Sequence, residues 1–128
     1  MDEVKYPEPE DIIEFNKIIL KEIKVKKADK PELISYKSLI GCIELCKQIK
    51  GNIYNKAACL LKSIVQKHPF ASGNRRTAFA VTERFLIDNG IKLKISNEAI
   101  NAEILKGIRE GYYSDEEIKN WLETGEIR

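Results

Sequence analysis

The sequence predicts an all-α fold, a compact bundle of about six helices with a central buried helix. Apolar residues recur every three or four positions along most of the chain, which is the period of an α-helix. Prolines, glycines and capping residues separate these segments. A length of 128 residues with 43% hydrophobic residues can supply one core of ordinary size, so we predict a single domain over residues 1–128.

The first two helices are predicted over residues 9–25 and 32–50. Pro9 suits the first turn of a helix, and the run KKADKP ends that helix. The second helix ends at Gly51-Asn52. Apolar side chains spaced for one core face are Ile12, Phe15, Ile19 and Ile23 in the first helix, and Leu33, Tyr36, Ile40, Ile43 and Cys46 in the second.

The third and fourth helices flank a predicted loop. The third helix has a core face and ends before Pro69, because a residue that precedes proline is disfavoured in the α region, so His68 lies on a loop. The fourth helix, over residues 74–89, carries TAFAVTERFLID, which is apolar on most sides and predicts the central buried helix. The core face of the third helix is Ile53, Ala57, Leu60, Leu61 and Ile64.

The C-terminal part predicts an extended connection followed by two helices. IKLKI, residues 91–95, alternates like a strand but has no partner strand, so we expect an extended connection. Ser96 can cap the fifth helix, and Ser114 with Glu117 forms a capping-box pattern for the sixth, in which Trp121 packs in the core. The core residues expected here are Ile100, Ile104, Ile108, Ile118, Trp121 and Leu122.

Charge and cysteine content exclude several classes of protein. A formal charge of +2 is too small for a domain that coats DNA or RNA, so a nucleic-acid partner is not expected. Cys42, Cys46 and Cys59 lack the spacing of a zinc site and read as free thiols in a reducing compartment. Neither a signal peptide nor a membrane span is recognisable, so we expect a cytoplasmic protein without a membrane partner.

The stretch HPFASGNRRTAF, residues 68–79, places two arginines at the predicted start of a helix. The N-terminus of a helix carries about half a positive charge and unpaired N–H groups, so Arg75 and Arg76 are unfavourable there unless an anion binds. Gly73 lets a ligand approach the backbone, and arginine can bind phosphate oxygens through two hydrogen bonds. The stretch therefore predicts a phosphate-binding site.

His68 is the single histidine of the chain and lies on the loop before this site. A neutral imidazole there could take a proton from a hydroxyl that attacks a bound phosphate. His68 could instead cap the preceding helix, with Phe70 holding the loop in the core. Spacing alone does not choose between these two interpretations.

HPFASGNRR resembles the signature of the Fic/Doc family, in which the histidine and phenylalanine precede an acidic residue, Gly or Ala, Asn, Gly or Lys, and Arg. YNKAACLL before the motif, TAF after it and FLIDNG at the helix end resemble the death-on-curing (Doc) branch. The specific part of the resemblance covers about residues 54–90. It implies a helical bundle of the Fic/Doc type and a transferase that moves part of ATP, or of another nucleoside triphosphate, onto a Ser or Thr hydroxyl of a protein.

By this resemblance His68 would be the catalytic base, and Phe70 would hold the loop in the core. Gly73 and Asn74 would form part of the anion hole. Arg76 matches the motif arginine that binds phosphate, and Arg75 stands where Doc-type members have lysine.

Two positions depart from the family pattern. Ser72 stands where the family has the acidic residue that holds Mg²⁺, and a hydroxyl is a poorer ligand for that ion, so Mg²⁺ binding is left open and no metal ligand is assigned. Ser72 is thus either close to a metal or a cap of the following helix. Phe79 stands where nucleotidyl-transferring members have a further arginine, and the Doc branch lacks that arginine too, which favours phosphoryl transfer by analogy.

The resemblance also implies protein partners. Residues 25–36 correspond to the flap that docks the target protein in the family, although a plain connection between helices fits them equally. The inhibitory Ser/Thr-x-x-x-Glu motif of some members is missing at SLIGC, residues 38–42, so a separate antitoxin would restrain the activity. The target would be a translation protein such as elongation factor Tu. The alternative function is a catalytically degenerate module that binds nucleotide or phosphate.

Overall fold

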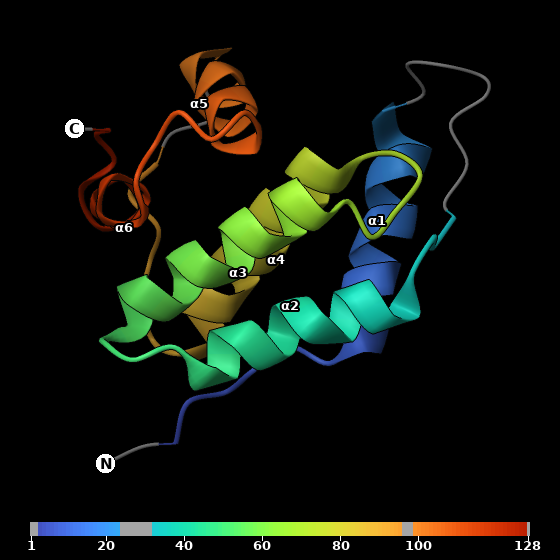
Figure 1. The fold of residues 1–128 in the computed structure, drawn as a ribbon, viewed down its shortest axis with the longest axis horizontal. Helices are drawn as coiled ribbons and strands as arrows, with labels where there is room; N and C mark the ends of the chain where they lie inside the picture. Colours follow the sequence, from blue (N-terminus) through green and yellow to red (C-terminus); the bar gives the residue numbers. More distant parts are fainter. Residues whose placement is uncertain (1–2, 24–31, 96–98, 128) are drawn as a thin grey trace.

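The computed structural model describes residues 3–23, 32–95 and 99–127, and its regular structure in these ranges is helical (Figure 1). The all-α prediction is confirmed. One isolated antiparallel bridge joins Leu33 and Phe70, and residues 91–95 form the expected irregular connection. The six helices are α1 (Pro9–Ile23), α2 (Tyr36–Gln48), α3 (Ile53–Lys67), α4 (Asn74–Asp88), α5 (Ala99–Arg109) and α6 (Asp115–Thr124).

The central helix is α3, and the prediction that residues 74–89 occupy the centre is wrong. α3 packs against α2, α4, α5 and α6, whereas α4 packs against α3 and α1. Small side chains let neighbours approach α3 closely, because Ala57, Ala58 and Ser63 are all buried. The apolar composition of α4 does not match its burial, since Ile87 is exposed while the polar Thr77 and Thr82 are buried.

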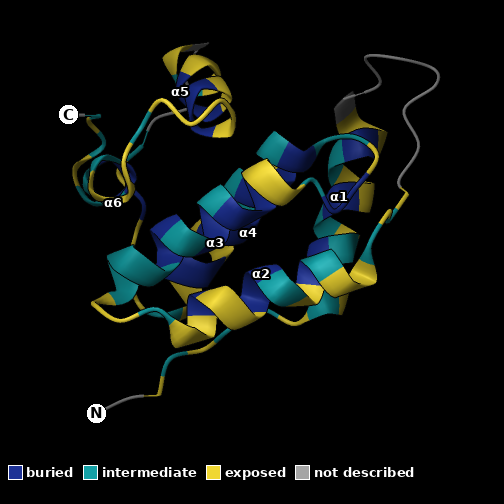
Figure 2. Cartoon of the chain, viewed as in Figure 1, coloured by how far each residue is buried: buried dark blue, intermediate teal, exposed yellow. Residues whose placement is uncertain are grey.

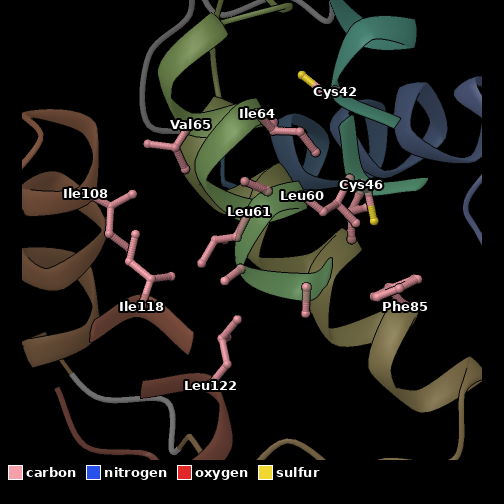
Figure 3. Close-up of a cluster of buried hydrophobic side chains, with 14 of the residues drawn as sticks. Cys42, Cys46, Leu60, Leu61, Ile64, Val65, Phe85, Ile108, Ile118 and Leu122 are labelled. Atoms are coloured by element: carbon pink, nitrogen blue, oxygen red, sulfur yellow. The ribbon is translucent and has the colours of Figure 1, made fainter. Parts of the chain in front are cut away.

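The core lies where α3 meets its neighbours, and Figure 2 shows buried residues concentrated there and exposed ones on the outer faces. Trp121 is fully buried, as predicted. The side chains labelled in Figure 3 come from all the helices that pack on α3 and from α3 itself: Cys42, Cys46, Leu60, Leu61, Ile64, Val65, Phe85, Ile108, Ile118 and Leu122.

The expected core face of α2 is partly wrong. α2 begins at Tyr36, because the Ser35 hydroxyl accepts a hydrogen bond from the Ser38 N–H and caps the helix there. Tyr36 and Ile40 are exposed, and the Tyr36 hydroxyl donates to Glu10 at the surface. The buried residues of α2 are Leu39, Cys42, Ile43 and Cys46.

Two other sequence expectations have clear outcomes. The capping box of α6 is confirmed, because the Ser114 hydroxyl accepts from the Glu117 N–H and the Glu117 carboxylate accepts from the Ser114 N–H. Ile100 is 59% exposed and not part of the core, since α5 turns Ile104, Leu105 and Ile108 inward. The expected cap at Ser96 and the core position of Ile23 lie outside the described residues and side chains.

Among the described helices, none combines the length and the apolar character that crossing a bilayer demands.

Candidate active site

The candidate site is the loop that leads from the end of α3 to the start of α4. His68 has φ 48° and ψ 60°, a left-handed conformation, and its backbone N–H donates to the Ile64 carbonyl at 3.2 Å. This conformation ends α3 and is compatible with the following Pro69. His68 thus caps α3 through its backbone, which leaves its imidazole available for a second role.

Asn74 holds the loop closed from within. Its Oδ1 accepts from the Phe70 N–H at 3.0 Å, and its Nδ2 donates to the Phe70 carbonyl at 2.8 Å. Phe70 itself is 2% exposed and packs in the core. Both polar atoms of the buried Asn74 amide are engaged within the loop, so this side chain shapes the loop.

Helix α1 supports the same loop through Asn16, which the sequence analysis missed. Asn16 is 1% exposed, and its Nδ2 donates to the Ser72 carbonyl at 2.9 Å and to the Thr77 hydroxyl at 3.1 Å. A polar residue on the apolar face between Ile12 and Leu20 was the available signal, since a buried amide needs partners.

Gly73 is required where it stands. Its φ of 77° is left-handed, and a Cβ there would lie 3.1 Å from Leu20 Cδ2 and 3.3 Å from Asn16 Nδ2. A side chain would therefore be strained by the backbone conformation and would push against α1. Glycine lets the loop pass this close to α1.

The segment before α2 pairs with the other edge of the loop. The Ile34 N–H donates to the Pro69 carbonyl at 2.8 Å, and the Ala71 N–H donates to the Glu32 carbonyl at 2.9 Å. The part of the expected flap that the structure describes, residues 32–36, is thus hydrogen-bonded to the loop that carries His68. Residues 25–31 of the expected flap lie outside the described residues.

The start of α4 leaves backbone donors without side-chain partners. Gly73 is its N-cap and no side chain caps the helix, so the expectation that Ser72 could be the cap is wrong. The first main-chain bond of the helix runs from the Thr77 N–H to the Gly73 carbonyl at 2.9 Å. The N–H groups of Asn74, Arg75 and Arg76 precede this bond and are available to an anion.

Positive charge gathers beside His68. Arg75 is half-buried and Arg76 is exposed, and within the described ranges no carboxylate forms a salt bridge with either. Burial lowers the pKa of His68, and the charges of Arg109 and Arg75 lower it further. A lowered pKa favours the neutral imidazole, which is the form that a general base needs. Arg109, from α5, carried no signal in the sequence.

The protein side chains do not fit a divalent cation. In the part of the chain that the structure describes, no three His, Cys, Asp or Glu side chains come together at metal-binding distance. Ser72 offers a hydroxyl where a carboxylate would be needed, and such ions prefer several charged oxygens. We assign no metal ligand to this chain.

Phe79 is partly buried and packs against the core. Its ring lies 6.0 Å from that of Trp121 in a tilted arrangement, so the two aromatic rings pack α4 against α6. No cation is supplied by this position.

Two surface clefts lie elsewhere. One, of about 420 Å³, lies between α1, α4 and the segment around Tyr6, and the other, of about 260 Å³, lies between α2, α3 and Asp115. Neither is lined by residues 68–76.

Comparison with known proteins places this loop in a sequence family. The sequence model of the Fic/DOC family matches residues 6–86, which include the loop, its supports in α1 and the whole of α3. The chain is also 40% identical over 53 residues to toxin Doc from Mycolicibacterium smegmatis, a match that spans 41% of this chain and 41% of that protein. A model that covers more than half of the chain shows the family, and the chain belongs to the Fic/DOC family.

Proposed function

We propose that the chain is a Doc-like transferase that moves the γ-phosphoryl group of ATP, or of another nucleoside triphosphate, to a Ser or Thr hydroxyl of a protein. One observation carries this proposal: the loop that begins at His68 leads into a helix N-terminus without a side-chain cap, whose first turn bears Arg75 and Arg76, and no carboxylate of the described residues forms a salt bridge with either. The helix end and the arginines can bind phosphate oxygens, while the imidazole can accept a proton.

The proposed reaction assigns each bond and proton. The target hydroxyl oxygen attacks the γ-phosphorus, and the bond from that phosphorus to the bridging oxygen of the β-phosphate breaks. The nucleoside diphosphate leaves, and the hydroxyl proton passes to the His68 imidazole. Backbone N–H groups of Arg75 and Arg76, together with their guanidinium groups, stabilise charge on the phosphate oxygens.

Phosphoryl transfer is preferred to nucleotidyl transfer because of Phe79. Nucleotidyl-transferring relatives would have an arginine there for the outer phosphates, whereas Phe79 is uncharged and packs on Trp121. We further propose a translation protein such as elongation factor Tu as the target, an antitoxin protein as the restraint, and the cytoplasm as the location.

Labelled ATP tests the reaction directly. The purified protein is incubated with cell extract and ATP labelled either at the γ-phosphate or at the α-phosphate. Label on a protein from the γ position alone is the expected result. Label from the α position would mean nucleotidyl transfer and would overturn the proposed chemistry.

The rival function is a catalytically degenerate module that binds nucleotide without transferring it, and Ser72 favours it. Ser72→Asp places a carboxylate beside the loop, so we expect it to make ATP binding depend on Mg²⁺ more strongly than in the wild type. Calorimetry with and without Mg²⁺ measures this, and Ser72→Asn serves as a control of similar size without charge. Equal Mg²⁺ dependence in all three proteins would show that position 72 is not close to a metal.

A further inference from the structure

Arg109 lies at the end of a helix that is fixed to the end of α3. The Gln66 side chain donates from Nε2 to the Ile108 carbonyl at 3.1 Å, and Gln66 precedes His68 by two residues. Ile108 is fully buried, and Figure 3 shows it on the side of α5 that faces α3. The backbone of Arg109 is therefore held beside the segment that leads into the candidate site.

The last turn of α5 is closed by its own hydrogen bonds. The Glu110 N–H donates to the Lys106 carbonyl at 3.0 Å, and the Tyr112 N–H donates to the Gly107 carbonyl at 2.9 Å. The ring of Tyr113 covers Gly107, where a Cβ would come within 2.5 Å of it. This packing keeps the end of α5 in one place, and the long Arg109 side chain projects from it.

The charge of Arg109 has no acidic partner within the described ranges. Its neighbour Glu110 hydrogen-bonds to the Tyr112 hydroxyl instead, which raises the pKa of Tyr112. Arg109 is exposed, and its charge and that of Arg75 add to burial in lowering the pKa of the His68 imidazole. Two cations from two helices thus act on the same imidazole.

We propose that Arg109 is a further phosphate-binding residue of this site, which acts with Arg75 on the polyphosphate of the nucleoside triphosphate. The inference rests on the proposed function, because it names a residue for the same substrate. A triphosphate carries several negative charges, and the N-terminus of α4 with the motif arginines offsets only part of them. A guanidinium from outside the motif supplies further hydrogen-bond donors to the outer phosphates.

Inorganic tripolyphosphate is the probe for this proposal, with affinity measured by calorimetry. Arg109→Gln is expected to weaken binding about 10-fold, the size of one charge-assisted contact. Lys106→Gln, also in the last turn of α5 and exposed, is the matched control and should change affinity little. Arg109→Lys should recover part of the loss, because it restores charge without the planar fork.

The single histidine gives an independent readout by NMR. Arg109→Gln is expected to raise the pKa of His68 in the free protein, because one of the two nearby cations is removed. Tripolyphosphate should raise it in the wild type as well, and less in Arg109→Gln. Lys106→Gln should behave like the wild type.

Several results would overturn the proposal. These are equal tripolyphosphate affinity in Arg109→Gln and wild type, equal losses in Arg109→Gln and Lys106→Gln, or a lower melting temperature in Arg109→Gln with unchanged affinity. A lower melting temperature with unchanged affinity would mean that Arg109 only stabilises the C-terminal end of α5. Label transfer that persists in Arg109→Gln at limiting ATP would refute the role of Arg109 and leave the proposed function standing. Tripolyphosphate binding that depends on Arg109, without any label transfer by the wild type, would support the role of Arg109 and refute the proposed function.

Discussion

Single buried amides decide the shape of the loop that carries His68. Asn74 closes the loop through two hydrogen bonds to the backbone of Phe70, and Asn16 ties the next part of the loop to α1. Buried polar groups are costly unless they are paired, so each amide specifies one conformation of the backbone that it contacts. The geometry around His68 thus depends on residues that do not take part in the proposed chemistry.

Asn16→Ala is expected to destabilise the fold by about 1–3 kcal/mol, because it leaves the Ser72 carbonyl and the Thr77 hydroxyl without their buried donor. Urea denaturation measures the free energy of unfolding, and the exposed neighbour Lys17→Ala is the control on the same helix. Tripolyphosphate affinity should also fall, since the loop loses its tie to α1. A free energy of unfolding equal to that of Lys17→Ala would show that Asn16 does not hold the loop.

His68 makes folding stability depend on pH in a defined direction. Burial and two nearby arginines lower the pKa of His68 in the folded state below its ordinary value, so the unfolded chain binds this proton more tightly. Its contribution is fully present above the unfolded pKa of about 6.5 and is lost as pH falls toward the folded pKa.

The pH effect is measured by comparing the free energy of unfolding at about pH 5 and about pH 7.5 for wild type and for His68→Asn, since Asn tolerates the left-handed conformation. The wild type should gain more stability with rising pH than the variant does. Identical pH dependence in the two proteins would mean that the pKa of His68 is not lowered.

At the scale of elements, the site depends on how closely the loop before α4 passes α1. Gly73 and Gly90 have similar positive φ values, 77° and 83°, but a Cβ at Gly73 would press on Leu20 and Asn16 whereas a Cβ at Gly90 would meet nothing within 4 Å. A substitution at Gly90 therefore tests backbone strain alone, and a substitution at Gly73 tests backbone strain together with close packing.

Gly90→Ala is expected to cost about 1 kcal/mol of folding stability from its backbone conformation alone. Gly73→Ala should cost this amount and a further contribution, about 1–3 kcal/mol, because α1 must also move. Urea denaturation of both variants gives the difference. Equal losses would show that the approach of the loop to α1 does not require glycine.

Most helices could be predicted from the sequence, because periodicity and capping residues act locally. The six segments and the caps at Ser114 and before Pro69 follow from neighbours in the chain. The start of α2 could not be predicted, since residues 32–35 pair with a loop some 35 positions further on. The central position of α3 could not be predicted either, because it depends on tertiary contacts with four other helices, which amino-acid composition does not determine.

The candidate site was predictable only in part, for the same reason. Arg75, Arg76 and His68 lie within one short motif, so their proximity follows from the chain. Arg109 and Asn16 come from helices far away in sequence, and tertiary packing alone brings them to the loop. From its position in the sequence, Ser72 could either lie close to a metal or cap α4. The structure excludes the role as helix cap, because Gly73 is the N-cap.

On the scale of the whole molecule, a nearly neutral chain places Arg75 and Arg76 at the start of α4, where no salt bridge joins them to a carboxylate of the described residues. The formal charge of +2 gives no general attraction to polyanions, whereas α4 and α5 bring Arg75 and Arg109 toward His68. Such an arrangement suits a small, highly charged ligand better than a long nucleic acid. In the proposed function, α3 and α4 hold the His68 imidazole beside a phosphate site.

The most direct measurement of this claim compares binding and transfer in one variant. His68→Asn should lower the rate of label transfer from γ-labelled ATP by about 10²–10⁴-fold, because a general base is lost, while calorimetry finds ATP affinity little changed. The double variant Arg75→Ala/Arg76→Ala should instead weaken ATP binding, because the phosphate oxygens lose two guanidinium groups. Arg84 forms a salt bridge with Asp88 on the same helix, and the control Arg84→Ala should leave ATP affinity unchanged. A His68→Asn protein that transfers label at the wild-type rate would contradict the account.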